Sequence, residues 1–204
     1  MDSDTATAHI LDADPAFTAV MQATGPFTPR SPDADPFNSL ARAIVFQQLA
    51  GPAARAIHGR FTALFDGHPT AEAILQTPIE QLRAVGLSGN KATSIADLAL
   101  KTTDGTVPLE RLDEISDAEI VQRLSTVRGI GRWTAEMFLI FQLQRPDIWP
   151  VDDLGIRKGF AAIHRLETPP TPKALDALGE IYRPYRSVAA WYCWRAVDTV
   201  LPQA

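Results

Sequence analysis

Four dipeptides that mark helix starts constrain the fold of this 204-residue chain more than any other sequence feature. Each joins a residue that favours the N-cap to a proline, which suits the first helical position because its missing N–H would have no partner there. The four are Asp14-Pro15, Asp35-Pro36, Thr77-Pro78 and Thr171-Pro172. Thr77–Glu80 and Ser116–Glu119 add the spacing of a capping box. Since no run shows sustained period-two alternation, the pattern predicts an all-α protein.

Apolar residues recur at helical spacing between these starts. Leu40 and Ile44 share one helix face, as do Ile120 and Leu124. We expect about ten short helices, with approximate spans 15–23, 36–49, 52–66, 70–76, 78–85, 90–101, 117–126, 133–143, 153–164, 172–182 and 186–200. The segments 24–35 and 102–116 are rich in turn formers and are expected to be loops.

The cysteine count and the hydropathy limit the class of protein. Cys193 is the one cysteine in the sequence, so the chain offers no disulfide framework, no four-cysteine zinc site and no iron–sulfur cluster. We expect its side chain to be a small buried hydrophobe. No apolar run reaches membrane-spanning length, and the acidic N-terminus is not a signal peptide. We therefore expect an intracellular protein, in a bacterial cytoplasm or a nucleus, with no membrane partner.

The net charge of −5 argues against nucleic acid as a partner until it is mapped along the chain. Residues 1–36 hold six Asp against one Arg and account for all of it. Residues 121–165 hold seven Arg or Lys against four Asp or Glu. Phosphate binding depends on this local potential more than on the total. Charge alone therefore leaves a DNA-binding surface and an ordinary solvated surface both open.

A pair of glycines carries most of the chemical information. Gly129 and Gly131 let the backbone turn tightly between two helical segments, and Ile130 would anchor the turn in the core. The N–H groups from Gly131 onward would begin the second helix unpaired, and such a terminus binds phosphate through its donors and its dipole. Arg128 and Arg132 flank it with positive charge. The pattern resembles the helix-hairpin-helix motif, which binds DNA.

An acidic pair follows this hairpin. Asp153 comes 22 residues after Gly131 and precedes Leu154-Gly155. Alone, Asp153 would be interpreted as an N-cap. Together with the hairpin, it resembles the helix-hairpin-helix (HhH-GPD) base-excision DNA glycosylases, above all the 3-methyladenine DNA glycosylase II type. The supporting stretches, in the family's order, are Gln47–Gly51, Gly129–Trp133, Arg145–Asp147, Asp153–Gly159, Arg183–Ser187 and Trp191–Arg195.

The resemblance implies one glycosylase unit over residues 1–204, built from two closely packed helical lobes. It places residues 37–125 in the first lobe and residues 1–36 with 126–204 in the second. The hairpin would span 124–137, with DNA and the base pocket in the cleft between the lobes.

The resemblance assigns catalysis to Asp153, the second acid of the pair, with Asp152 as its neighbour. The carboxylate would face the positive charge that develops on the sugar, or would orient or deprotonate the attacking water, and both roles stay open. A wedge that fills the gap left by the flipped base is placed at Gln48 with Leu49, although Gln48 equally suits a polar helix end. The residues expected to contact DNA are Arg128, Gly129, Ile130, Gly131, Arg132, Thr134 and Lys158.

Trp133 stands where strand-cutting relatives carry a lysine that forms a Schiff base with the sugar. Tryptophan has no amine, so the resemblance implies a monofunctional enzyme that leaves an abasic site. An electron-rich indole also attracts a cationic N-alkylated purine such as 3-methyladenine or 7-methylguanine. For Trp149 and Trp191 we expect ordinary core packing. The base pocket implied by the resemblance comprises Trp133, Trp194, Leu154 and Met137, the last standing where some members have tyrosine.

The resemblance also implies partners and ions. The partner would be double-stranded DNA with alkylated bases, bound by a monomer that requires no cofactor. A structural Na⁺ or K⁺ would be held by hairpin carbonyls at Thr126, Val127 and Ile130. Two alternatives stay open: a glycosylase of the same fold for uracil, hypoxanthine or an oxidised purine, and a hairpin module that binds DNA without catalysis.

Overall fold

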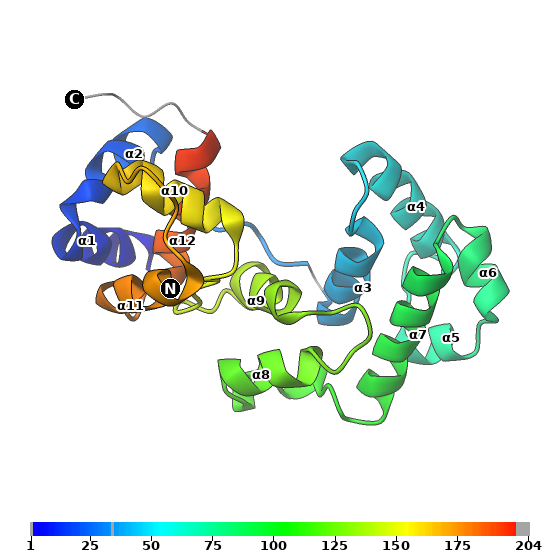
Figure 1. The fold of residues 1–204 in the computed structure, drawn as a ribbon. Helices are drawn as coiled ribbons and strands as arrows, with labels where there is room; N and C mark the ends of the chain where they lie inside the picture. Colours follow the sequence, from blue (N-terminus) through cyan, green and yellow to red (C-terminus); the bar gives the residue numbers. More distant parts are fainter. Residues whose placement is uncertain (1, 34, 199–204) are drawn as a thin grey trace. The chain divides into compact units, whose positions relative to one another are not determined.

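The computed structural model describes residues 2–33 and 35–198, and within them every regular element is helical (Figure 1). The all-α prediction is therefore confirmed. The α-helices are α1 (Ser3–Ala13), α2 (Thr18–Thr24), α3 (Pro36–Phe46), α4 (Gly51–Ala63), α5 (Ala71–Leu75), α6 (Ile79–Ala84), α7 (Gly89–Thr103), α8 (Asp117–Leu124), α9 (Arg132–Phe141), α10 (Leu154–His164), α11 (Pro172–Leu178) and α12 (Arg186–Asp198). The 3-10 helices are η1 (Pro15–Phe17), η2 (Leu109–Glu114) and η3 (Gly179–Tyr182).

Helix α1 lies before the first helix that the sequence pattern predicts. The Asp2 side chain caps it by accepting hydrogen bonds from the N–H groups of Asp4 and Thr5. Its buried residues are Ala6 and Ile10, so the apolar stripe is only one turn long. So short a stripe carries too little periodicity to distinguish a helix from an acidic tail.

Three of the four expected N-caps are confirmed. The side chains of Asp14, Asp35 and Thr171 cap η1, α3 and α11. Thr77 is the exception, because its hydroxyl donates to the Ala73 carbonyl at 2.8 Å and Pro78 takes the N-cap position of α6. A threonine hydroxyl that donates to the carbonyl four residues earlier cannot point forward to cap the next helix.

Two expected spans differ from the observed elements. The helix expected over 172–182 divides into α11 and η3, and the loop expected over 102–116 contains η2. Both differences involve short 3-10 segments, which are too short to show an apolar repeat in the sequence.

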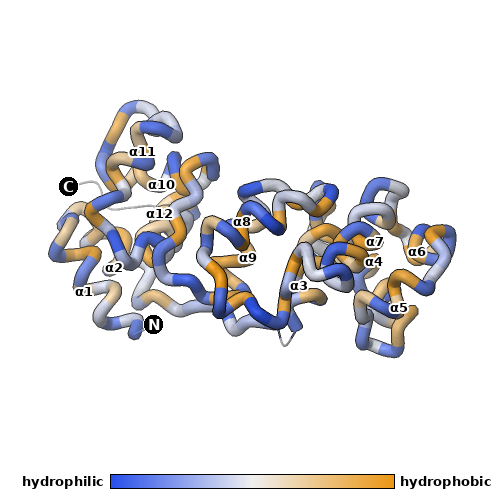
Figure 2. The backbone as a smooth tube through the Cα atoms, turned by 90° about the horizontal axis from the view of Figure 1, so that it is seen from below, coloured by the Kyte–Doolittle hydropathy of each residue, from blue (hydrophilic) through white to orange (hydrophobic). Residues whose placement is uncertain are grey.

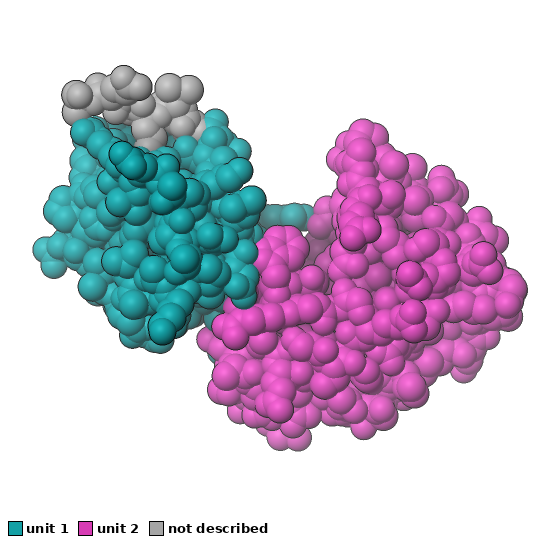
Figure 3. Space-filling view, in the orientation of Figure 1, with its two compact units in different colours: residues 1–32, 139–204 teal, residues 33–138 magenta. Residues whose placement is uncertain are grey.

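The chain divides into two compact units, coloured separately in Figure 3. Unit 1 comprises residues 1–32 and 139–204, and unit 2 comprises residues 33–138. The second boundary falls within α9, rather than at residues 125 and 126 where the sequence placed it. The hairpin turn therefore belongs to unit 2, and the acidic pair belongs to unit 1.

The core of unit 1 centres on α10 packed along α12. A Cβ on Gly159 would lie 1.8 Å from the Cys193 carbonyl oxygen, so only glycine allows the two helices to approach so closely. Cys193 is fully buried, and burial raises the pKa of its thiol, as expected of a hydrophobe and not of a nucleophile. Trp149 is buried, and Trp191 is partly buried against the same core, which confirms the packing expected of both.

The core of unit 2 forms around α7, which packs against α3, α5 and α6. Figure 2 shows apolar residues recurring between hydrophilic ones along these helices. The hydropathy pattern therefore buries one stripe of each helix and leaves another stripe for polar contacts. Fully buried side chains of this core are Leu40, Ile44, Phe61, Leu82, Ile95 and Leu98.

Candidate DNA-binding hairpin and catalytic acid

The hairpin turn joins α8 to α9 in a conformation that requires glycine. Gly129 has φ +79°, and a Cβ there would lie 2.7 Å from the Ser94 hydroxyl oxygen on α7. Val127 and Ile130 are buried on either side of it, with exposed fractions of 2% and 3%. The expectation that Ile130 anchors the turn in the core is confirmed.

Two charged side chains of α7 hold the backbone before this glycine. Asp97 accepts a hydrogen bond from the Arg128 backbone N–H at 2.7 Å and pairs with Lys101 at 2.9 Å. The Lys101 ammonium donates in turn to the Thr126 carbonyl. Burial alone would raise the pKa of Asp97, but these bonds and the adjacent positive charge outweigh it and lower that pKa.

A glutamine ties the end of α3 to the same turn. The Gln47 side-chain amide donates to the Gly129 carbonyl at 2.9 Å. The Lys91 ammonium on α7 donates to the carbonyls of Val45 and Gln47, each at 2.7 Å. Partial burial lowers the pKa of Lys91. Helix α7 therefore holds both the hairpin and the segment that the sequence assigned to the wedge.

The proposed wedge has a strained backbone. Helix α3 ends at Phe46, three residues before its expected end, because Gln47 leaves the helical conformation with ψ 131°. Gln48 then adopts a left-handed conformation with φ +56°. Gln48 is exposed, and the Leu49 side chain is 39% exposed. A non-glycine residue held at positive φ on a surface turn is a feature often associated with function.

The two arginines of the hairpin differ in how firmly their side chains are held. Arg128 is exposed, and its guanidinium lies 3.3 Å from the Asn90 side-chain oxygen. Arg132 pairs with Glu136 one turn later at 2.8 Å, and Glu136 is only 5% exposed on its side chain. Arg132 is thus oriented by a buried acid. Gly131 is exposed at the start of α9, as expected for a helix terminus that binds phosphate.

Helix α9 also carries two of the expected pocket residues. Trp133 lies in its first turn and is 49% exposed, which distinguishes it from a core tryptophan. Met137 and Thr134 are partly buried on the same helix.

Asp153 is both an N-cap and part of a polar contact. Its Oδ1 atom accepts the Ile156 backbone N–H at 2.9 Å and the Trp194 indole N–H at 3.0 Å. The N-cap interpretation and the catalytic one are therefore compatible, because the cap itself fixes the carboxylate. A Cβ on Gly155 would lie 2.9 Å from Trp194 Cδ1, which explains why a glycine stands there.

Trp194 is held from two directions. Its ring stacks on Phe141 with centroids 5.6 Å apart and planes 29° from parallel, and its N–H is committed to Asp153. The side chains of Leu154 and Lys158 are exposed on α10, Leu154 by 52%. The resemblance assigned Trp194 to the base pocket. The structure adds a second contact, because its indole N–H also orients Asp153, which the spacing in the sequence does not show.

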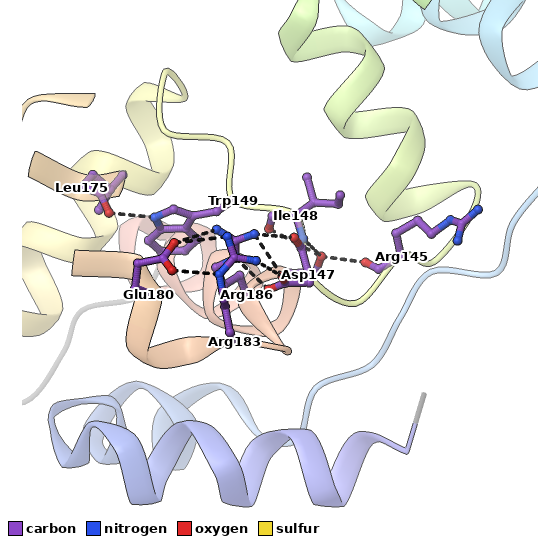
Figure 4. Close-up of polar contacts among 9 residues, drawn as sticks. Arg145, Asp147, Ile148, Trp149, Leu175, Glu180, Arg183 and Arg186 are labelled. Atoms are coloured by element: carbon purple, nitrogen blue, oxygen red, sulfur yellow. Dashed lines mark hydrogen bonds and ion pairs between the residues drawn. The ribbon is translucent and has the colours of Figure 1, made fainter. Parts of the chain in front are cut away.

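The loop that precedes Asp153 is anchored by an ion-pair cluster (Figure 4). The Asp147 carboxylate accepts from Arg186 at 2.7 and 3.0 Å and from Arg183 at 2.5 Å. Ser187 donates to the Arg145 carbonyl at 2.7 Å and accepts the Ile148 N–H at 3.0 Å. The stretches Arg145–Asp147 and Arg183–Ser187, both part of the family resemblance, thus bind each other. The sequence analysis gave neither stretch a role.

A buried tryptophan completes the anchor. The Trp149 indole N–H donates to the Leu175 carbonyl at 2.8 Å (Figure 4). A Cβ on Gly179 would lie 2.2 Å from the Trp149 indole nitrogen, so the ring is closely confined. The loop between Trp149 and Asp153 therefore starts and ends at fixed points.

Two of the three hairpin carbonyls that the resemblance assigned to a monovalent metal ion already accept hydrogen bonds. The Thr126 carbonyl already accepts from the Lys101 ammonium, and the Val127 carbonyl accepts the Ile130 N–H at 3.0 Å. A metal ion at the Thr126 carbonyl would lie beside that ammonium, whose charge Asp97 only partly offsets, so repulsion between like charges opposes its binding.

The fold and these two regions define a family, and the chain belongs to it. Residues 41–184 match the model of the HhH-GPD superfamily base excision DNA repair protein. The chain is 38% identical over 192 residues to DNA-3-methyladenine glycosylase 1 of Schizosaccharomyces pombe, covering 92% of this chain and 84% of that protein. No helix in the described part of the chain is long and apolar enough to cross a membrane.

Solved structures agree with this family. A structure of the S. pombe 3-methyladenine DNA glycosylase (Mag1) in complex with abasic DNA superimposes with a TM-score of 0.83 at 38% identity, covering 96% of this chain and 97% of that one. A DNA-3-methyladenine glycosidase from Bacillus halodurans gives a TM-score of 0.88 at 30% identity, covering 95% and 89%. The expected helix-hairpin-helix glycosylase fold is confirmed.

Proposed function

We propose that this protein is a monofunctional DNA glycosylase of base excision repair that releases alkylated purines from double-stranded DNA. The observation that carries the proposal is the fixed Asp153 carboxylate, held by the first turn of α10 and by Trp194. Its support is a family whose relatives are named 3-methyladenine DNA glycosylases. Its partner would be intracellular DNA, bound by a monomer.

Asp153 would supply the charge that the reaction needs. As the bond between base and deoxyribose breaks, positive charge develops on the sugar, and a fixed carboxylate stabilises it without having to reorganise. Two hydrogen bonds to Oδ1 fix the orientation of the group before substrate binds. The same carboxylate would orient the water that attacks the sugar, or accept its proton.

Alkylated purines suit the aromatic residues of the proposal. A purine methylated at N3 or N7 is cationic, and an indole face attracts such a ring by about 0.5–2 kcal/mol. The half-exposed Trp133 would supply that face, with Trp194, Leu154 and Met137 as further pocket residues. A cationic base is already a good leaving group, so the site needs no strong general acid.

The hairpin would hold the DNA backbone while the base is out of the stack. Exposed N–H groups at the start of α9 would bind a phosphate, with Arg128, Arg132 and Lys158 as further contacts. Gln48 and Leu49, exposed on their strained turn, would fill the gap in the duplex. Because Trp133 has no amine, the product would be an intact strand with an abasic site.

The test is base release from methylated duplex DNA by the purified protein, with the strand checked for cutting before and after alkali. We expect release of 3-methyladenine or 7-methylguanine, and cutting only after alkali. Asp153→Asn should lower the single-turnover rate by at least about 100-fold while leaving duplex affinity within about twofold. Asparagine keeps an oxygen that can accept from Ile156 and Trp194, so the loss would report the charge.

Asp152→Asn is the matched control, since it removes the same charge from the exposed neighbouring position. It should retain near wild-type release. The proposal is falsified if Asp153→Asn keeps near-normal turnover. If the protein released uracil or an oxidised purine and no methylated base, the proposed glycosylase reaction would stand and the proposed substrate class would be overturned.

A further inference from the structure

Helix α7 of unit 2, labelled in Figure 1, carries an ion pair between Asp97 and Lys101. The two residues are one turn apart, and their side chains are only 23% and 22% exposed. A surface pair of this kind usually contributes little to stability. This pair differs because both partners also bind backbone groups of another segment.

The pair encloses the backbone on both sides of Val127. Asp97 Oδ2 accepts the N–H of the residue after it, Arg128, at 2.7 Å. The Lys101 ammonium donates to the carbonyl of the residue before it, Thr126. Val127 itself is 2% exposed, so its side chain and both adjacent backbone groups are fixed at once. Three anchors therefore hold three consecutive residues of the hairpin.

We propose that Lys101 is the resident cation of the hairpin: its ammonium, balanced by Asp97, takes the place of a monovalent metal ion and positions the backbone that presents the phosphate-binding donors. The role of Lys101 in DNA binding rests on the proposed function. Its role in place of a metal ion does not, because that role concerns the hairpin alone. Lys101 is thus a positioning residue that acts through the backbone of Thr126 and Arg128.

A covalently tethered ammonium behaves differently from a metal ion. Its local concentration does not depend on the salt in solution, so the hairpin would be fixed at any K⁺ or Na⁺ concentration. An ammonium also needs only a few oxygen acceptors, and here two are present, the Thr126 carbonyl and the Asp97 carboxylate. The Val127 carbonyl, used by the Ile130 N–H, is not required.

The first measurement uses the unmodified protein without DNA. Thermal unfolding is followed in KCl, NaCl and choline chloride at equal ionic strength, because choline is too large for a carbonyl cage. We expect the three Tm values to agree within about 1 °C, where 1 kcal/mol corresponds to roughly 2–4 °C for a chain of this size. A saturable rise of Tm with K⁺ or Na⁺ would overturn the proposal.

The second measurement compares Lys101→Met with Lys173→Met, which removes the same charge from an exposed position on α11. Lys101→Met should lower Tm by roughly 3–8 °C, since it leaves the Thr126 carbonyl and Asp97 without the ammonium. Part of that loss should return in KCl or NaCl and not in choline chloride, while Lys173→Met should match wild type in all three. Equal destabilisation of Lys101→Met in every salt would overturn the replacement role.

Binding to a fluorescent duplex with a tetrahydrofuran abasic-site analogue completes the test. Lys101→Met should bind about tenfold more weakly than Lys173→Met, and Lys101→Arg should recover most of the affinity because a guanidinium retains the charge. Equal affinity of the two methionine variants would overturn the positioning role. If wild type binds no duplex, the proposed function fails, while the salt dependence of Tm still decides the role of Lys101.

Discussion

The hairpin of unit 2 and the acid loop of unit 1 are both fixed, but by different kinds of contact. The hairpin is held through its backbone, by side chains that reach it from α7 and from the end of α3. The acid loop is held through side chains, by Asp147 and its arginines at one end and by Asp153 itself at the other. The exposed Arg128 side chain of the hairpin is thereby left for a ligand, whereas the loop's own side chains maintain its shape.

This difference predicts how each region responds to substitution. In the hairpin, an exposed side chain can change without altering the turn, because the turn depends on residues elsewhere in the chain. In the acid loop, a change of side chain alters the anchor and with it the orientation of the catalytic candidate. Two experiments test this contrast, and a third tests the Asp14 carboxylate elsewhere in unit 1; they follow in order of decreasing expected effect.

The largest effect should come from Asp147→Asn in the acid loop. Its carboxylate serves two arginines, and Arg186 is only 11% exposed on its side chain, so the change leaves a poorly solvated guanidinium with only the longer contact to Glu180 at 3.5 Å. We expect a loss of about 2–3 kcal/mol and a Tm lower by roughly 5–10 °C. Circular dichroism melting would measure it.

Glu114→Gln is the control, since it breaks an ion pair with Arg111 in which both side chains are more than half exposed. It should leave Tm unchanged. Equal melting of the two variants would show that the Asp147 cluster is no anchor, and the contrast between the two regions would fail.

A smaller effect is expected for Arg128→Met in the hairpin. The Arg128 side chain is exposed while its backbone N–H is bound by Asp97, so stability should stay the same. Duplex affinity should fall equally for all sequences, and the slope of log K against log salt should drop by about 1. Arg132→Met should change that slope less, because Glu136 already neutralises part of its charge. Sequence-dependent losses would instead indicate base reading.

The smallest effect concerns pH and Asp14 in unit 1. Its carboxylate accepts from Tyr182 at 2.6 Å and from His164 at 2.7 Å. Burial alone would raise the pKa of Asp14, but these hydrogen bonds outweigh it and hold that pKa below 3.8. A lowered folded-state pKa stabilises the fold above the unfolded value, and that contribution disappears as pH falls through the folded value.

Asp14→Asn should therefore cost about 1 kcal/mol at pH 7, and the difference from wild type should shrink below pH 4. Urea unfolding of both proteins at pH 7 and near pH 3 measures the change. A difference that stays constant over this range would mean that the carboxylate charge contributes nothing.

Local signals predicted much of the fold. Asp35, Ser116 and Thr171 cap the helices that their positions indicated, since a cap depends on groups only two or three residues away. The missed elements, α1 and η2, lack enough apolar repeats to register as periodic. The end of α3 was placed too late because nothing in a Gln-Gln pair indicates a left-handed backbone.

The sequence by itself determined the helices, the turn at Gly129 and the acidic pair, since each depends on neighbours along the chain. Only the tertiary structure decided that Lys101 binds the hairpin carbonyl, that Trp194 orients Asp153, and that Asp147 binds Arg183 and Arg186. These contacts join residues 25 to 41 positions apart. In the sequence Lys101 and Arg186 look like ordinary helix surface, because polar partners so far apart leave no periodic pattern.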